Sequence, residues 1–257
     1  MSATTDATGV ARLAKLIREA DSVVALTGAG ISVPSGIPDF RSPGTGLWEK
    51  VDPMEVAHID VFRRDPARFW HFYGDRFATL RTKEPNAAHR ALVELERRGH
   101  LDAVITQNID MLHRRAGTGD LIEVHGSIAT CSCPPCGAEV ELDDARARLA
   151  ADPDGVPRCA CGAALKPDVV LFGEMLDEGD MQRAAGLAAG ADVLLCVGSS
   201  LEVYPVAGLP EITRRGGGKL ALITQGPTPF DHQAEIKLEG DVVNELTSLV
   251  SALTPNA

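Results

Sequence analysis

The sequence predicts an α/β fold in which one doubly wound parallel sheet carries a smaller lobe formed by insertions. Short apolar runs recur along the chain, and each stops abruptly at small or polar residues. Helical patterns separate several of these runs, and strands that alternate with helices imply a parallel sheet. Two stretches break the alternation, and we therefore interpret them as insertions between strands.

The predicted strands are the apolar runs 22–27, 103–106, 121–124, 193–197, 220–223 and, more weakly, 234–238. A covering helix is expected over 10–20, where Val10, Leu13 and Ile17 share one helical face. Another is expected over 86–98, which follows a proline and precedes a glycine. The carboxyl ends of parallel strands meet at one edge of the sheet, where ligands bind. The polar residues that follow the strands should therefore converge on one site.

The two insertions are 36–85 and 126–167. The first begins as a Gly/Pro loop and becomes helical, and the second holds five of the six cysteines. The sheet domain would comprise 10–35, 86–125 and 168–257, preceded by a flexible tail at 1–9. A chain of 257 residues is long enough for one large core and a second, smaller lobe.

The composition of the chain argues against several classes of function. A formal net charge of −11 argues against a nucleic-acid binder, because phosphate affinity comes mainly from clustered Lys and Arg. No apolar run approaches membrane-spanning length, and the N-terminus has no secretory pattern. We expect a cytoplasmic protein without nucleic-acid or membrane partners, and we expect it to be a monomer. Clustered cysteines in a reducing compartment are read first as metal ligands.

Two glycines follow the first predicted strand, in Gly28-Ala29-Gly30-Ile31. Glycines at this spacing let backbone N–H groups at a helix start approach phosphate oxygens. The dinucleotide fingerprint is incomplete, because Val33 stands where a third glycine is usual. A tight strand-to-helix turn is the plain alternative.

The next loop carries an acid, a base and two aromatic residues, namely Asp39, Phe40, Arg41 and Trp48. A loop this long and this rich in special residues suits a flap over a cofactor. An ordinary surface loop explains the same residues equally well.

Polar side chains follow the second and third strands. Gln107, Asn108 and Asp110 could hold a ribose or an amide by hydrogen bonds, whereas capping of a helix is the alternative. His125 follows the third strand, and an imidazole titrates near neutrality, as a general base must. A lone histidine is more often structural, so only its neighbours at the same edge favour catalysis.

The cysteines indicate a metal site. Four thiolates in two close pairs suit a tetrahedral Zn²⁺ with no open position, which is a structural site. The preferred ligands are Cys133, Cys136, Cys159 and Cys161. The second pair has one intervening residue where two to four are usual, and Cys131 is a competing ligand. Cys196 lies alone in an apolar strand and is expected to pack in the core.

Together these motifs resemble the sirtuin family in order and spacing, over about residues 10–249. The motifs are Gly28–Ser32, Gly36–Ser42, Thr106–Asp110, His125–Gly126, the paired cysteines, Phe172–Glu174 and Gly198–Ser200. The resemblance implies a Rossmann-like NAD domain with a small zinc lobe, and an acyl-lysine peptide bound between them. It also implies an NAD-dependent protein-lysine deacylase that releases nicotinamide and forms 2′-O-acyl-ADP-ribose.

The resemblance also implies a role for each matching residue. His125 would be the catalytic base that removes a proton from the ribose hydroxyls. The diphosphate and nicotinamide half of NAD would contact Gly28, Ala29, Gly30, Ile31, Asp39, Phe40, Arg41, Trp48, Gln107, Asn108 and Asp110. The adenosine half would contact Gly198, Ser199, Ser200, Thr224, Gln225 and Val242. The substrate backbone would add as a strand between Val170–Gly173, which includes Phe172, and Glu202–Tyr204. Thr224 departs from the family, which usually has an asparagine there.

The sequence leaves two alternatives for the acyl group that the enzyme would remove. Tyr73 and Arg76 lie three residues apart and share a face of a predicted helix. In sirtuins that remove succinyl or malonyl groups, a Tyr-x-x-Arg at this location binds the acyl carboxylate, a task that suits the bidentate arginine. Alternatively Tyr73 packs, Arg76 is solvated and the pocket takes acetyl, which the loop around Asp39 favours.

Two other functions use the same residues. Protein mono-ADP-ribosyl transfer shares the NAD site and the departure of nicotinamide but uses a different nucleophile. A non-catalytic NAD-sensing or zinc-scaffold module would require a dead site, which the joint presence of Asn108, Asp110 and His125 disfavours.

Overall fold

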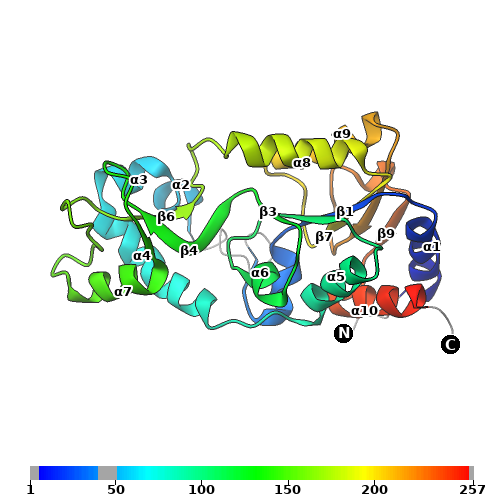
Figure 1. The fold of residues 1–257 in the computed structure, drawn as a ribbon, viewed down its shortest axis with the longest axis horizontal. Helices are drawn as coiled ribbons and strands as arrows, with labels where there is room; N and C mark the ends of the chain where they lie inside the picture. Colours follow the sequence, from blue (N-terminus) through cyan, green and yellow to red (C-terminus); the bar gives the residue numbers. More distant parts are fainter. Residues whose placement is uncertain (1–5, 40–50, 255–257) are drawn as a thin grey trace.

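The computed structural model describes residues 6–39 and 51–254, and it has two lobes side by side (Figure 1). The larger lobe holds a parallel sheet in the order β3-β2-β1-β7-β8-β9. Its strands are β1 (Val23–Thr27), β2 (Ala103–Thr106), β3 (Leu121–Glu123), β7 (Val193–Val197), β8 (Lys219–Ile223) and β9 (Ile236–Leu238). Every predicted strand is present, which confirms the α/β fold.

Helices cover both faces of this sheet. One core cluster joins α1 (Ala7–Arg18), α5 (Ala87–Arg97) and α10 (Val242–Leu253) to Val23 and Ala25. A second cluster joins α8 (Glu178–Gly190) and α9 (Leu209–Arg215) to Val24 and Leu26. Successive residues of β1 thus enter opposite cores, and all five are buried. Burial on both faces explains why the central strands are continuous apolar runs.

The first helix begins at Ala7, three residues before the predicted start. Asp6 provides the N-cap, since its Oδ1 accepts a hydrogen bond from the N–H of Gly9 at 2.9 Å. The predicted tail at 1–9 is therefore too long at its C-terminal end. Residues 1–5 lie outside the described part of the chain.

The smaller lobe is built from the two predicted insertions. The first supplies α2 (Pro53–Val56), α3 (Ile59–Arg64) and α4 (Pro66–Arg81). The second supplies the antiparallel strands β4 (Gly126–Ser132), β5 (Glu139–Glu141) and β6 (Lys166–Val169), with α7 (Leu142–Ala151). Trp70 of α4 is buried in the shared core and donates its Nε1–H to the carbonyl of Leu165 at 2.9 Å. Strand β6 ends at Val169, two residues past the predicted boundary at 167.

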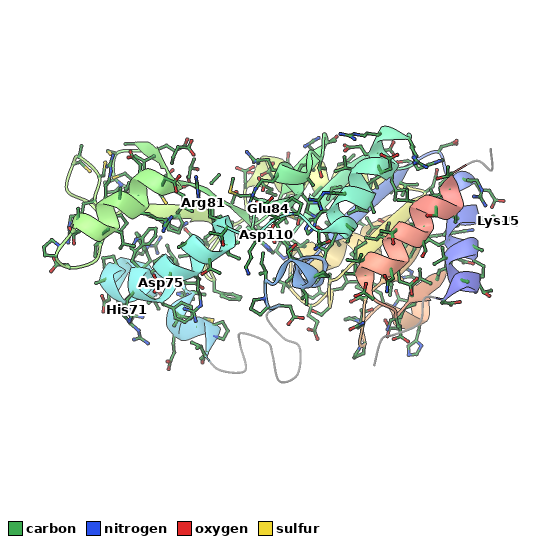
Figure 2. The ribbon with its side chains drawn as sticks, turned by 90° about the horizontal axis from the view of Figure 1, so that it is seen from below. Lys15, His71, Asp75, Arg81, Glu84 and Asp110 are labelled. Carbon is green, nitrogen blue, oxygen red and sulfur yellow. The ribbon has the colours of Figure 1, made fainter. Side chains whose placement is uncertain are left out.

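The short elements are η1 (Ala29–Ser35), α6 (Leu112–Ala116), η3 (Val206–Gly208) and η4 (Asp231–Gln233). Figure 2 shows Asp110 at the junction of the lobes, with Arg81 and Asp75 of α4 on one side and Lys15 of α1 at the far end of the other. Among the described residues, no helix is long and apolar enough to cross a bilayer.

Candidate active site

A pocket of about 460 Å³ opens at the carboxyl ends of the parallel strands. Pockets of this size are typical of small-molecule sites. It collects most of the predicted NAD residues, together with the predicted base and one substrate residue. These are Gly28, Ala29, Gly30, Asp39, Gln107, Asn108, His125, Gly198, Ser199, Ser200, Glu202, Thr224, Gln225 and Val242. Phe40, Arg41 and Trp48 lie outside the described residues.

The glycines after β1 permit a close approach of two strand ends. Gly30 N–H donates to the carbonyl of Gly198 at 2.8 Å, and a Cβ on Gly30 would lie 2.7 Å from the Cα of Gly198. Gly198 has a φ of +60°, and its own Cβ would lie 2.4 Å from the backbone nitrogen of Ile31. Glycine is therefore needed here for packing between β1 and β7, in addition to any phosphate contact.

Asn108 presents an acceptor to the pocket. Its Nδ2 donates to the carbonyl of Gly28 and to Ser32 Oγ, both at 3.1 Å. Since both amide hydrogens are engaged, the side-chain oxygen Oδ1 is left to accept from a ligand. Gln107 is held in a similar way, because its Nε2 donates to Ser199 Oγ at 2.9 Å.

Asp110 and Ile31 lie beneath the pocket surface. Asp110 is buried, and its carboxylate accepts hydrogen bonds from Ser32 Oγ at 2.6 Å and from the N–H of Leu112 at 2.9 Å. Burial raises the pKa of Asp110, and these two hydrogen bonds oppose the shift. The bond to Leu112 lies at the start of α6, as the helix-capping alternative expects, and Asp110 does not itself line the pocket. Ile31 is fully buried in the large core.

The orientation of His125 follows from one hydrogen bond. Its Nδ1 lies 2.9 Å from the carbonyl oxygen of Gln107. A carbonyl can only accept, so Nδ1 carries the proton, and the neutral ring has its lone pair at Nε2. Burial lowers the pKa of His125, although the hydrogen bond to Gln107 opposes that shift. The ring is thus neutral at neutral pH, with Nε2 ready to accept a proton.

The four predicted cysteines form one cluster at the end of the small lobe. Their Sγ atoms all lie within 4.8 Å of one another, with Cys133 to Cys161 at 3.4 Å and Cys136 to Cys159 at 3.6 Å. Zn–S bonds of about 2.3 Å in a tetrahedron place sulfurs about 3.8 Å apart, so the residues fit a structural zinc. Cys131 is outside this cluster; burial raises its pKa to about 12, which keeps it a thiol.

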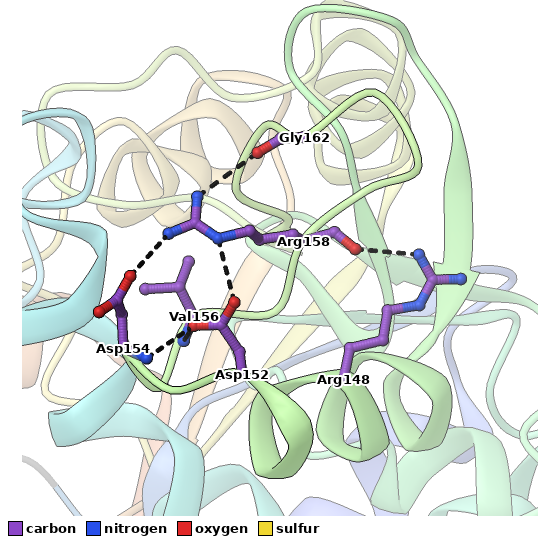
Figure 3. A network of polar contacts seen from close by, with 6 residues as sticks. All are labelled: Arg148, Asp152, Asp154, Val156, Arg158 and Gly162. Atoms are coloured by element: carbon purple, nitrogen blue, oxygen red, sulfur yellow. Dashed lines mark hydrogen bonds and ion pairs between the residues drawn. The ribbon is translucent and has the colours of Figure 1, made fainter.

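The compressed second pair is supported by an arginine network (Figure 3). Arg158 precedes Cys159 and donates to Asp152 at 3.1 Å, Asp154 at 3.4 Å and the carbonyl of Gly162 at 3.4 Å. The Gly162 N–H in turn donates to the carbonyl of Cys159 at 2.9 Å. Arg158 therefore ties both ends of the Cys159–Cys161 turn to the loop before it.

Of the predicted substrate segments, Glu202 and Val203 line the pocket, whereas residues 170–173 and Tyr204 do not. Val170 N–H donates to the carbonyl of His125 at 2.9 Å. Phe172 forms a parallel bridge with His58, and its N–H donates to the carbonyl of Ala57 at 2.9 Å. Gly173 has a φ of +84°, and a Cβ there would lie 2.6 Å from the Nε2 of His58. The side chains of Phe172 and Tyr204, one from each segment, are accessible to solvent, with exposed fractions of 38% and 72%.

Tyr73 and Arg76 lie on α4, as predicted, but neither lines the pocket. Tyr73 stacks on Phe77 with ring centroids 5.0 Å apart, and burial raises its pKa to about 12. The Arg76 guanidinium lies 3.7 Å from the ring centroid of Phe72.

Sequence reasoning missed part of the pocket wall. The additional lining residues are Val33, Pro34, Ile223, Gly226, Pro227, Gly240 and Asp241. Gly240 and Asp241 follow β9, so the strand-end argument would have found them had that weakly patterned strand been weighted equally. The remainder have apolar or turn-forming side chains, which carry no chemical signal of their own.

Comparison with known proteins decides the family. A model described as the Sir2 family matches residues 28–205. The chain belongs to the Sir2 family. The sirtuin resemblance is thereby confirmed, and curated relatives extend it over almost the whole sequence. An NAD-dependent protein deacetylase of Caldivirga maquilingensis is 43% identical over 95% of this chain and 96% of its own. An NAD-dependent protein deacylase of Thermus thermophilus is 42% identical over 92% of each chain.

Solved Sir2 structures have the same architecture. A Sir2 complex with a p53 peptide and NAD⁺ has a TM-score of 0.86 and 40% identity, over 93% of this Sir2 chain and 96% of the other. A variant Sir2 complex with deacetylated p53 peptide and 3′-O-acetyl-ADP-ribose has a TM-score of 0.89 at the same identity and the same coverage of both chains. The overall architecture of this Sir2 protein is thus that of solved members of its family.

Proposed function

We propose that this Sir2 protein is an NAD-dependent protein-lysine deacylase that transfers the acyl group to ADP-ribose and releases nicotinamide. The main support is the geometry of His125, which lines the pocket. The backbone carbonyl of Gln107 holds its proton at Nδ1. Relatives named as deacetylases and deacylases, and Sir2 structures with acetylated or propionylated peptides, support the assignment.

NAD fits the donors and acceptors of the pocket. Among its described lining residues, Asp39, Glu202 and Asp241 are acidic and none is Lys or Arg. Backbone N–H groups of 28–30 would meet the diphosphate, and Arg41, which lies outside the described residues, remains a predicted contact. Ser199 and Ser200 would contact the adenosine half. The ribose hydroxyls would donate to Asn108 Oδ1. Asp110 would lie one layer below, where its carboxylate fixes Ser32 and the start of α6.

The reaction uses the base directly. When bound, NAD supplies an ADP-ribosyl group that the acyl oxygen of the substrate attacks as nicotinamide leaves. His125 would then accept at Nε2 the proton of a ribose hydroxyl as that hydroxyl attacks the acyl carbon. The bond to the lysine amine breaks, and water adds to the cation that remains, which gives O-acyl-ADP-ribose. A positioned general base typically contributes about a hundredfold or more.

The acyl-lysine peptide would lie between Val170–Gly173 and Glu202–Tyr204 as an added strand. Val170 supports this placement, because its N–H is bonded to the carbonyl of the base residue itself. The proposed peptide segment and His125 would then be joined directly through their backbones. We propose acetyl as the preferred acyl group, since Arg76 stacks on Phe72 and Tyr73 packs in an aromatic row. The Tyr73–Arg76 carboxylate clamp would require both side chains to leave these contacts.

A panel of acyl-lysine peptides assayed with NAD tests the function. Expected products are nicotinamide, free lysine peptide and O-acyl-ADP-ribose in equal amounts. Nicotinamide release with ADP-ribose found on a protein acceptor would instead indicate mono-ADP-ribosyl transfer. No release with any acylated peptide would indicate a non-catalytic module.

We also propose a monomer in the cytoplasm that binds neither membranes nor nucleic acid. Reduced zinc cysteines suit a reducing compartment. The acidic net charge disfavours nucleic acid. Light scattering of the purified protein and fractionation of cells check the two positive statements.

A further inference from the structure

His113 is a buried histidine for which the reaction has no direct use. It lies on α6, is 2% exposed and does not line the NAD pocket. Its Nε2 lies 2.9 Å from Thr27 Oγ1, whereas its Nδ1 has no hydrogen-bond partner among the described residues. One ring nitrogen is thus engaged and the other is not.

The hydrogen bond from His113 continues to the active site. Thr27 and Thr106 are register partners at the last positions of β1 and β2, and their Oγ1 atoms are 2.8 Å apart. Thr106 Oγ1 accepts from the backbone N–H of Asn108 at 3.1 Å. A buried row of three side chains therefore leads from α6 to Asn108.

The direction of these bonds can be assigned. Burial lowers the pKa of His113 to about 3, so the ring is neutral and carries one proton. A buried N–H without an acceptor is rarer in native proteins than an under-satisfied acceptor. The unpartnered Nδ1 is therefore the lone pair, and Nε2–H donates to Thr27. Thr27 in turn donates to Thr106.

We propose that His113 is a positioning residue for the NAD site. Its bond fixes the hydroxyls that hold the ends of β1 and β2 together, and Gly28 and Gln107 directly follow these strands. Across the same junction Asn108 Nδ2 donates to the carbonyl of Gly28 at 3.1 Å. The row thereby sets where Gly28 and Asn108 face the ligand. This inference rests on the proposed function, because its main readout is NAD turnover.

Packing alone is the competing explanation, since the His113 ring also meets the His89 ring edge-on with centroids 4.9 Å apart. Three variants separate the two. His113→Gln keeps an N–H at the Nε2 position, His113→Asn keeps one only near Nδ1, and His113→Phe keeps the ring without a donor. Thr27→Val removes the next member of the row.

The test measures kcat/KM for NAD, KM for an acetyl-lysine peptide, and NAD affinity by calorimetry without peptide. Misplacement by about 1 Å can reduce turnover on the order of a hundredfold, so the Phe and Asn variants should lose about tenfold or more in kcat/KM for NAD. The Gln variant should recover most of that loss, and the peptide KM should stay unchanged. Thr27→Val combined with His113→Phe should be no worse than either alone.

Normal NAD kinetics in both the Phe and Asn variants would overturn the proposal, as would a Gln variant as impaired as Phe. Should the Phe variant fail to fold, the Gln and Asn pair decides. A wild-type protein that binds NAD but deacylates no peptide would instead contradict the proposed function. In that case the calorimetric NAD affinities of the variants still test His113.

Discussion

The imidazole Nδ1 of His125 donates to the backbone carbonyl of Gln107, 2.9 Å away. Gln107 is also fixed by its side chain, which donates to Ser199 at the end of β7. The backbone carbonyl of His125 accepts from Val170, which begins the proposed peptide segment. Hydrogen bonds therefore fix both the imidazole and the backbone carbonyl of His125.

Replacing His125 by alanine should nearly abolish deacylation. The loss removes a base that typically contributes about a hundredfold or more, while NAD binding and zinc content should stay normal. Measurements of nicotinamide release, zinc content and thermal unfolding check this. His232→Ala is the matched control, because that histidine is exposed on η4 and does not line the pocket. Near-normal turnover in His125→Ala would remove His125 from the mechanism.

The pH dependence should report the same residue. His125 acts when deprotonated, and burial lowers its pKa from the usual 6.5. Activity should therefore persist as pH falls to 6.5 and be lost only below that pH. In the acid limb, a plot of log kcat/KM against pH should have a slope of one, because a single group titrates. A profile of kcat/KM from acid to neutral pH measures the midpoint. A midpoint above 6.5 would mean that another group, or a protonated ring, controls the rate.

The strand ends could be predicted because they depend on a simple rule. Apolar runs such as 193–197 locate buried parallel strands, and the residues after them must meet at one edge. The same rule places Asn108, His125 and Ser199 at one edge from the sequence alone. The two cysteine pairs also predict a structural zinc site from the sequence, since four thiolates at close spacing have few other uses.

The sequence could not predict how deeply a site residue is buried, or which neighbour a polar side chain contacts. Asp110 and Ile31 share motifs with pocket residues, yet both lie beneath the surface. Asp110 accepts hydrogen bonds from Ser32 and Leu112, and Ile31 of η1 packs in the large core. Arg76 has the spacing of a carboxylate ligand, but a neighbouring ring competes for its guanidinium. Sequence spacing specifies which residues share a face, and packing decides what each of them contacts.

Loss of zinc should unfold the small lobe selectively. Cysteine replacement, as in Cys159→Ser, removes a ligand, and binding energy at structural zinc sites is folding energy. Trp70 lies in that core, so its fluorescence should change while NAD affinity, which depends on the large lobe, changes little. The signal is assigned by its loss in Trp70→Phe. An unchanged Trp70 environment after zinc removal would contradict a structural role.

Arg158 should slow the release of zinc. Its contacts to Asp152, Asp154 and Gly162 hold the short cysteine turn, and exposed ion pairs of this kind contribute modestly to stability. Arg158→Ala should therefore raise the rate of zinc transfer to a chelator by roughly threefold to tenfold. Arg146→Ala is the control, because Arg146 pairs with Asp143 on the same helix, away from the cysteine turn. Equal rates in the two variants would show that the turn needs no such support.

Acyl preference can be decided at Arg76. Its guanidinium stacks on Phe72 and also donates to the Phe72 carbonyl, and such a cation–π contact is worth about 0.5–1 kcal/mol at exposed sites. A succinyl carboxylate would have to draw Arg76 away from both contacts, and Tyr73 would have to leave its stack on Phe77. We expect acetyl-lysine peptides to be preferred over succinyl-lysine peptides, and Arg76→Ala to change acetyl turnover by less than about threefold, as for other partly exposed sites. A variant that loses desuccinylation while it keeps deacetylation would establish the Tyr73–Arg76 clamp instead.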